Sequence, residues 1–258
     1  MNAPNHALSA ILIALLALLA SGLLPAQESP ANLSEAWYVT VKPGHQAAFE
    51  TAFKEHARVR NDHGDPRSWD VFTPITGENL YVYGIRTCCF SWPDQDAYDQ
   101  WNRDNAAVME HWSSEVDPHV EHYGHYFYET DSANSHWTDN GEPVRLVGVT
   151  EFYPAPGHSA DFTAARTELS QVAIEQGWTE GGHRWAWLNR IGGKPVTILA
   201  VAYSNYAAMN PQDPSFYEFL SDHLGADRAN ALMKQLSGST RGSKYSIWAH
   251  RADLTAAE

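Results

Sequence analysis

The segment Pro43-Gly44-His45-Gln46-Ala47-Ala48-Phe49 recurs as Pro156-Gly157-His158-Ser159-Ala160-Asp161-Phe162 at an offset of 113 residues. At this offset, residues 43–64 and 156–177 are identical at nine of 22 positions. Chance composition would give about one or two identities. A repeat at such a long spacing indicates that the chain contains two copies of one structural unit.

The sequence pattern of the first copy predicts strands and helices on both sides of the Pro-Gly-His segment. Residues 36–41 alternate apolar and polar side chains, which is typical of a half-buried strand. Pro43-Gly44 interrupts the strand, and a helix is expected to follow. This helix is expected over residues 46–62, and the strands of a hairpin over residues 69–75 and 80–90. A second helix is expected to start after Pro93, and a last strand to cover residues 123–129.

The second copy predicts the same order with one insertion. Its hairpin strands are expected over residues 184–191 and 196–203, and its final strand over residues 244–251. A longer helical segment, residues 214–236, is expected to be broken near Gly225. Gly64 and Gly177 occupy equivalent positions where a helix commonly ends in a glycine.

The order in each copy is therefore β-α-β-β-α-β, the ferredoxin-like arrangement. One such unit covers a single sheet face with helices and leaves the other face apolar and open. We therefore predict an α+β protein in which two ferredoxin-like units are fused into an intramolecular α+β barrel. The expected boundaries are a signal peptide, an N-terminal tail, a first repeat, a linker and a second repeat over residues 1–26, 27–34, 35–131, 132–142 and 143–254.

The strand followed by the Pro-Gly-His-x-Ala-x-Phe segment and a helix resembles the first strand–helix junction of the dimeric α+β barrel superfamily. That superfamily includes antibiotic-biosynthesis-monooxygenase-like, NIPSNAP-like and heme-degrading domains, in which two units usually pair between chains. The resemblance implies a ligand cavity between each sheet and its helices. It implies no single chemistry, because one fold hosts unrelated activities.

The N-terminal residues indicate export. Residues 7–20 form an apolar run interrupted only by Ser9, which fits the hydrophobic region of a signal peptide. Cleavage is expected after Gly22 or Ala26, although an uncleaved anchor helix is the alternative because no Lys or Arg precedes the run. We expect a periplasmic or secreted protein without a membrane segment after cleavage.

The two cysteines, Cys88 and Cys89, are neighbours in a predicted strand. Adjacent Cα atoms lie about 3.8 Å apart across a trans peptide, below the usual disulfide range. We therefore expect two reduced thiols on opposite faces of the strand. A vicinal disulfide is the alternative.

The charge is strongly negative, with 31 acidic and 17 basic residues and a net charge of −14. Phosphate binding needs the opposite sign, so nucleic acid is excluded as a partner. Residues 35–131 carry 17 acids and 7 bases. His119 and His122 lie in this acidic half and would share a face if the segment were helical, which suggests a Zn²⁺, Ni²⁺ or Cu²⁺ site. The alternative is a solvated acidic surface with scattered histidines.

His56 is the candidate catalytic residue. It falls on the core-facing stripe of the first helix, where the second copy has Leu169. A buried imidazole there could act as a general base or as an axial heme ligand, or it could be a core histidine with a hydrogen-bond partner. The repeated His45 and His158 are expected to be turn residues that cap the following helices. The alternative is an imidazole at the mouth of a pocket that acts as acid, base or heme ligand.

Aromatic residues are abundant, with 10 Trp and 12 Tyr. Several lie on the predicted hairpins and could line a cavity for a flat apolar ligand. The alternative is that they fill the cores. The candidate ligand-binding residues are Trp69, Tyr81, Tyr83, His183 and Trp185.

The sequence therefore predicts an exported protein that binds a small apolar or aromatic ligand in a monooxygenase-like cavity. One alternative is a cofactor-independent oxygenase or heme-handling enzyme that uses a cavity histidine. A second is a non-enzymatic interaction or metal-binding module that uses the acidic first repeat. The residues identify neither a reaction nor a cofactor. A monomer is favoured because the paired units lie in one chain, and the pair His56 and Leu169 suggests that one cavity is degenerate.

Overall fold

The computed structural model describes residues 30–138 and 141–255. The predicted signal peptide lies outside the described residues. Within the described ranges, no helix has the length and apolar character needed to cross a membrane.

The first half follows the predicted order closely. Its helix α2 (Gln46–Asp62) has the predicted bounds. The second predicted helix is divided in two and continues into short irregular turns. The elements are β1 (Leu33–Val41), α2, β2 (Asp70–Pro74), β3 (Val82–Phe90), α3 (Trp92–Asp104), α4 (Ala106–His111), the π turn η2 (Trp112–Val116), the 3₁₀ turn η3 (Asp117–His119) and β4 (Val120–Thr130).

The second half repeats this order and carries the predicted insertion, which breaks at Gly225 between two helices. Short 3₁₀ turns occur at Ser132–Asn134, Trp178–Gly181 and Ala207–Met209. The main elements are β5 (Leu146–Pro154), α5 (Ser159–Glu175), β6 (Trp185–Ile191), β7 (Thr197–Tyr203), α6 (Phe216–Leu224), α7 (Ala226–Gly238), β8 (Thr240–His250) and α8 (Ala252–Thr255).

The structure confirms that the repeated glycines, Gly64 and Gly177, follow the C-terminal ends of equivalent helices. Gly64 follows α2 with a φ of 66°, and Gly177 follows α5 with a φ of 85°. This left-handed backbone is open to glycine without steric cost. The expected capping by His45 and His158 is wrong: both residues precede their helices, but neither imidazole makes a capping hydrogen bond.

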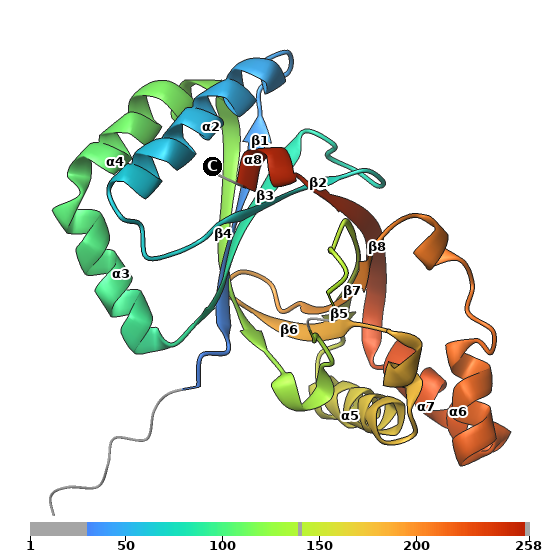
Figure 1. Ribbon diagram of the computed structural model, residues 1–258. Coiled ribbons are helices and arrows are strands. Elements are labelled where there is room, and N and C mark those ends of the chain that lie inside the picture. Colours follow the sequence, from blue (N-terminus) through green and yellow to red (C-terminus); the bar gives the residue numbers. More distant parts are fainter. Residues whose placement is uncertain (1–29, 139–140, 256–258) are drawn as a thin grey trace, which may run out of the picture. The chain divides into compact units, whose positions relative to one another are not determined.

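The eight strands close into one antiparallel barrel in the order β1-β3-β2-β8-β5-β7-β6-β4. The two halves meet at the β2–β8 and β4–β6 pairs. Figure 1 shows α2, α3 and α4 covering the strands of the first half, while α5, α6 and α7 cover those of the second. The predicted α+β barrel is therefore confirmed. The sheet faces that the helices leave uncovered in the two halves together line the inside of the barrel.

The core of the first half contains one residue from the far end of the described chain. Leu254 on α8 is only 1% exposed and packs in the cluster that includes Val39, Phe49 and Val71. Figure 1 shows α8, in dark red, beside the blue α2. Arg251 holds this segment by donating to both carboxylate oxygens of Glu50 on α2, at 2.7 and 2.9 Å.

The cysteine prediction is wrong. Cys88 and Cys89 are joined by a disulfide across a cis peptide bond, and their Cα atoms lie 3.0 Å apart. The expectation of two thiols assumed a trans peptide, which holds neighbouring Cα atoms about 3.8 Å apart.

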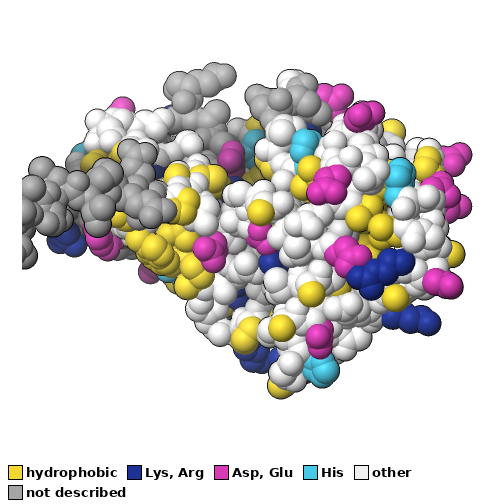
Figure 2. All heavy atoms as spheres, turned by 90° about the horizontal axis from the view of Figure 1, so that it is seen from below, with side chains coloured by type: hydrophobic (Ala, Val, Ile, Leu, Met, Phe, Trp, Pro, Cys, Tyr) yellow, Lys and Arg dark blue, Asp and Glu magenta, His cyan; other side chains and the backbone are white. Residues whose placement is uncertain are grey.

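The surface of the second half is less acidic than that of the first. Residues 143–258 hold 11 acids and 10 bases, so their charges almost cancel. On the face in Figure 2, magenta acidic and dark blue basic side chains are interspersed, and yellow hydrophobic side chains gather in a few places between them. The negative charge of the chain therefore comes mainly from the half that contains α2, α3 and α4.

Candidate functional site

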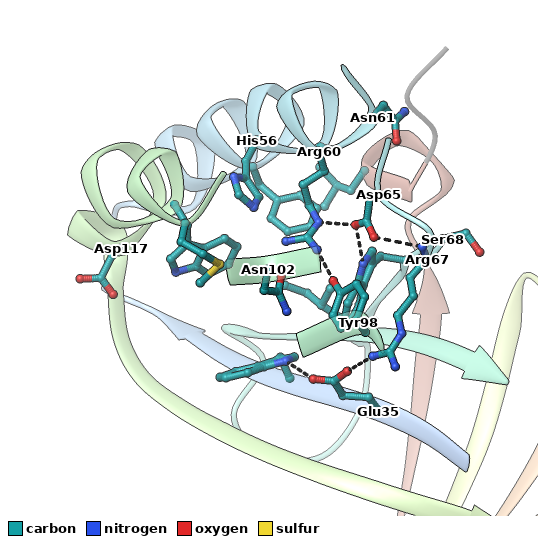
Figure 3. Close-up of a pocket in the computed structure, with 18 of the residues that line it drawn as sticks. Glu35, His56, Arg60, Asn61, Asp65, Arg67, Ser68, Tyr98, Asn102 and Asp117 are labelled. Carbon is teal, nitrogen blue, oxygen red and sulfur yellow. Dashed lines mark hydrogen bonds and ion pairs between the residues drawn. The ribbon is translucent and has the colours of Figure 1, made fainter. Parts of the chain in front are cut away.

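A cavity of about 540 Å³ lies in the first half, between the outer face of its strands and helices α2 to α4. Most of its wall surface is apolar, and charged and polar side chains gather at one end and along the rim (Figure 3). Such a lining is typical of sites for small, largely apolar molecules. The apolar residues that line it include Trp37, Phe53, Trp69, Ile85, Met109, Trp112 and Leu254.

His56 lies in the wall of this cavity, as the helical pattern predicted. Its side chain points from α2 toward the interior in Figure 3. The residue is 2% exposed, and its Nδ1 has no hydrogen-bond partner. Burial, helped by the nearby Arg60 and His111, lowers the pKa of His56 to about 3. The imidazole is therefore neutral at physiological pH, and its Nδ1 is a buried polar atom without a hydrogen-bond partner in the cavity wall.

One polar cluster closes the end of the cavity next to α3. Arg60 donates to Asp65 at 2.6 Å and also to the hydroxyl of Tyr98 (Figure 3). Trp69 donates its indole N–H to the same carboxylate at 3.2 Å. Burial raises the pKa of Tyr98, so that its hydroxyl stays protonated. This cluster is internally paired and orders the loop between α2 and β2.

A second polar cluster is centred on Glu35, which is 4% exposed on β1. Its carboxylate accepts hydrogen bonds from Arg67 at 2.7 Å, Trp37 at 2.8 Å and His125 at 2.8 Å. The His125 ring also stacks on Trp37, with ring centroids 4.0 Å apart. The three donors satisfy the buried charge and fix the Trp37 ring as part of the cavity wall.

The other predicted ligand-binding residues have different positions. Trp69 lines the cavity with His56. Tyr83 is buried and donates to Glu50 at 2.8 Å, whereas Tyr81 is 54% exposed. In the second half, His183 stacks on Trp178 and Trp185 packs in the core with Phe162. The structure thus brings together two of the six predicted catalytic and ligand-binding residues.

His119 and His122 do not share a helical face, because His119 ends the η3 turn and His122 lies in β4. His119 instead meets His45, with 3.1 Å between their Nδ1 atoms. Within the described ranges, no group of three or more His, Cys, Asp or Glu side chains is arranged to hold a metal ion. A metal at His119 and His122 stays a prediction of the sequence.

The corresponding region of the second half is filled by side chains. Leu169, at the position equivalent to His56, is 4% exposed. It packs against Phe219, Leu220 and Leu232 from the inserted helices α6 and α7. The expected asymmetry between the halves therefore has a structural cause, because the insertion supplies the apolar groups that cover α5.

The sequence reasoning missed the charged residues of the cavity: Glu35, Arg60, Asp65 and Arg67. They are separated in the sequence and look like ordinary surface charges of an acidic half. One available signal was the position of Glu35, which directly precedes the predicted strand of residues 36–41. Its pairing with Arg67, however, depends on how the loop folds back over the sheet.

Comparison of the sequence with known proteins finds no relative, whereas comparison of the structure with solved structures finds similar folds. No family model and no curated protein matches the sequence. Among solved structures, a proposed monooxygenase from Fusobacterium nucleatum subsp. nucleatum is similar, with a TM-score of 0.54 and 12% identity, over 84% of this chain and 91% of that chain. A proposed monooxygenase from Lactobacillus acidophilus has a TM-score of 0.53 and 8% identity, over 86% and 94% of the two chains.

A third similar structure is a mutant chlorite dismutase from Candidatus Nitrospira defluvii. It has a TM-score of 0.51 and 8% identity, over 88% of this chain and 93% of that chain. Identities this low relate the folds and not the activities. Together with the closed eight-stranded barrel and its outer helices, they show that this chain has the dimeric α+β barrel fold, with both units in one polypeptide.

Proposed function

We propose that the protein binds a small, flat, uncharged aromatic molecule in the first-half cavity, with one polar atom of the ligand hydrogen-bonded to His56. The unpartnered Nδ1 of this buried imidazole carries the proposal. A neutral imidazole has one donor and one acceptor nitrogen, so it suits a phenol or a carbonyl group. The surrounding aromatic wall suits the apolar body of such a ligand.

Binding is favoured over proton abstraction. A pKa of about 3 makes His56 a weak base, because an efficient general base has a pKa near the working pH. The proposed monooxygenases among the similar structures motivate a test for oxygen consumption. Uptake of O₂ that depends on both the ligand and His56 would favour the oxygenase alternative.

Heme is the second candidate ligand. His56 fits as an axial ligand, because its ring is neutral and has a nitrogen without a partner. The cationic side chains of the cavity are less suited to heme, whose two propionates are negatively charged. Arg60 and Arg67 are the guanidinium groups among the described lining residues, and they are already paired with Asp65 and Glu35. An uncharged ligand therefore agrees better with the cavity.

The test is calorimetric titration of the folded protein with 2-naphthol and with naphthalene. We expect 2-naphthol to bind more tightly by up to about tenfold, the size of one net hydrogen bond. The variant His56→Leu copies the residue of the second half. It should still bind naphthalene but should bind 2-naphthol no better.

Equal affinities in the parent protein, or a preference for 2-naphthol that survives in His56→Leu, would contradict the proposal. His56→Gln is the matched control, because its amide can replace the hydrogen bond, and part of the preference should return. An absorption spectrum of protein purified from its own host tests the heme candidate directly.

We also propose that the protein is exported and acts as a monomer. The apolar run of residues 7–20 supports export, and the closure of the barrel within one chain supports the monomer. N-terminal sequencing of protein from its host should begin at residue 23 or 27. Light scattering should give a molar mass near that of one chain, and a dimer would contradict the second proposal.

A further inference from the structure

A second cavity, of about 890 Å³, lies inside the barrel and shares no lining residue with the first. Inward-facing residues of all eight strands contribute to its wall. Several inward positions carry small side chains, which leaves space that larger ones would fill. These are Ala36, Gly84, Ala186 and Ala200, and the apolar wall is completed by Val147, Val149, Leu188, Ile198 and Trp248.

Arg86 is the distinctive group in this cavity. It lies on β3 and lines the interior, and its guanidinium makes no hydrogen bond or ion pair with the described residues. Burial lowers its pKa, although the proximity of Asp70 opposes this effect. Arginine stays charged in proteins. Arg86 is half-buried, and a cation without a partner in such a cavity is costly unless a bound anion supplies the missing charge.

The acidic residues that line the cavity already have other partners. Asp70 lies 3.2 Å from Nε2 of His250. Glu151 accepts the hydroxyl hydrogen of Tyr153. The negative carboxylates of Asp70 and Glu151 would repel additional anionic groups on a ligand. The cavity therefore suits a ligand with one negative charge better than one with several.

Two tyrosines complete a group of donors around Arg86. Tyr38 on β1 and Tyr128 on β4 line the same cavity, and their hydroxyl oxygens lie 3.1 Å apart. β1 pairs with both β3 and β4, so the three side chains come from adjacent strands. Burial raises the pKa of both tyrosines, which keeps the phenols protonated. One hydroxyl can donate to the other, and the second hydrogen is left for a ligand oxygen.

We propose that the barrel interior is a second binding site, for a monocarboxylic acid with a flat apolar body. The carboxylate pairs with the Arg86 guanidinium and accepts a hydrogen bond from the Tyr38–Tyr128 pair. The apolar body lies against the aliphatic wall and Trp248. This site does not depend on the function proposed for the first cavity.

The test is calorimetric titration with 2-naphthoate and with the uncharged 2-naphthamide, which has a similar shape. We expect naphthoate to bind at least tenfold more tightly than the amide. Arg86→Gln should remove this difference, while Arg58→Gln, at an exposed position on α2, should keep it. Arg86→Gln removes an unpaired, half-buried charge, so its Tm should be at least that of the parent protein.

Ala200→Phe gives an independent test, because it fills the cavity without changing a charge. Binding of naphthoate should fall at least tenfold in this variant, and saturating 2-naphthol should not compete with naphthoate in the parent protein. Equal binding of acid and amide would overturn the proposal. So would parent-like naphthoate affinity in both Arg86→Gln and Ala200→Phe, or competition by 2-naphthol, which would place the acid in the first cavity.

Discussion

At the scale of single residues, His56 shows how a buried polar group connects function to stability. The imidazole is enclosed by α2 and by aromatic neighbours, including Trp112, whose ring centroid lies 5.1 Å away. Burial makes protonation costly, so the ring remains neutral in the folded state. The same enclosure that suits a ligand therefore makes the protein sensitive to acid.

The His56→Leu variant should lose part of this acid sensitivity. Between pH 6.5 and pH 3 the unfolded chain protonates His56 but the folded protein does not, so the stability of the parent protein falls as the pH falls. Between pH 7.5 and pH 5 the parent should lose about 2 kcal/mol more unfolding free energy than the variant. Urea unfolding at both pH values measures this difference, and parallel losses would contradict the assigned burial.

At the scale of elements, the cavity depends on the loop that joins α2 to β2. Arg67 in this loop reaches Glu35 on β1, and it also donates to Gln95 on α3 at 2.8 Å. Both members of the Glu35–Arg67 pair are nearly buried, with side chains 6% and 8% exposed. This one guanidinium therefore holds three parts of the cavity wall together.

Removal of Arg67 alone should be strongly destabilising. Arg67→Met leaves the buried Glu35 without its arginine, and we expect a loss of about 3–5 kcal/mol in unfolding free energy. The double variant Glu35→Gln with Arg67→Met should recover most of this loss, since the amide oxygen still accepts from Trp37. Chemical denaturation of the single and double variants measures the coupling.

The surface pair Glu55–Arg58 provides the control for this prediction. Its side chains are 55% and 65% exposed, so Arg58→Met should change stability by less than about 1 kcal/mol. A loss in Arg67→Met no larger than in Arg58→Met would show that the buried pair does not hold the wall.

The elements also show which features the sequence could predict. The repeat followed from the similarity of two segments 113 residues apart. The bounds of α2 and the inward position of His56 followed from local periodicity and from glycine, whose effects extend over a few residues. The segment from Trp112 to His119 was harder, because it leaves the α-helical path and so separates His119 from His122. The Glu35–Arg67 pair and the Cys88–Cys89 disulfide depend on backbone geometry and on contacts that no local pattern encodes.

At the scale of the whole molecule, the two halves form one structure and not two independent domains. The β2–β8 and β4–β6 pairs close the barrel, and both halves line its interior cavity. Leu254 adds a third connection, because α8 follows the last strand of the second half but packs into the first. It also lines the first cavity.

Leu254→Ala should therefore affect the first half from a distant position in the sequence. Loss of this buried side chain should reduce the unfolding free energy by about 2–4 kcal/mol and weaken binding of 2-naphthol. Leu80→Ala, at a site that is 54% exposed, is the matched control and should change neither quantity. Thermal unfolding and calorimetry measure the two effects, and a silent Leu254→Ala would contradict the role of α8.

The position of α8 also has a consequence for synthesis of the protein. The ribosome completes β4 long before it reaches Leu254, so the nascent first half lacks one wall of its core and of its cavity. Its inner sheet face also has no second half to cover it at that stage. Early emergence therefore gives the first half little advantage in folding, and its nascent form presents apolar surface that chaperones can bind until the second half has been made.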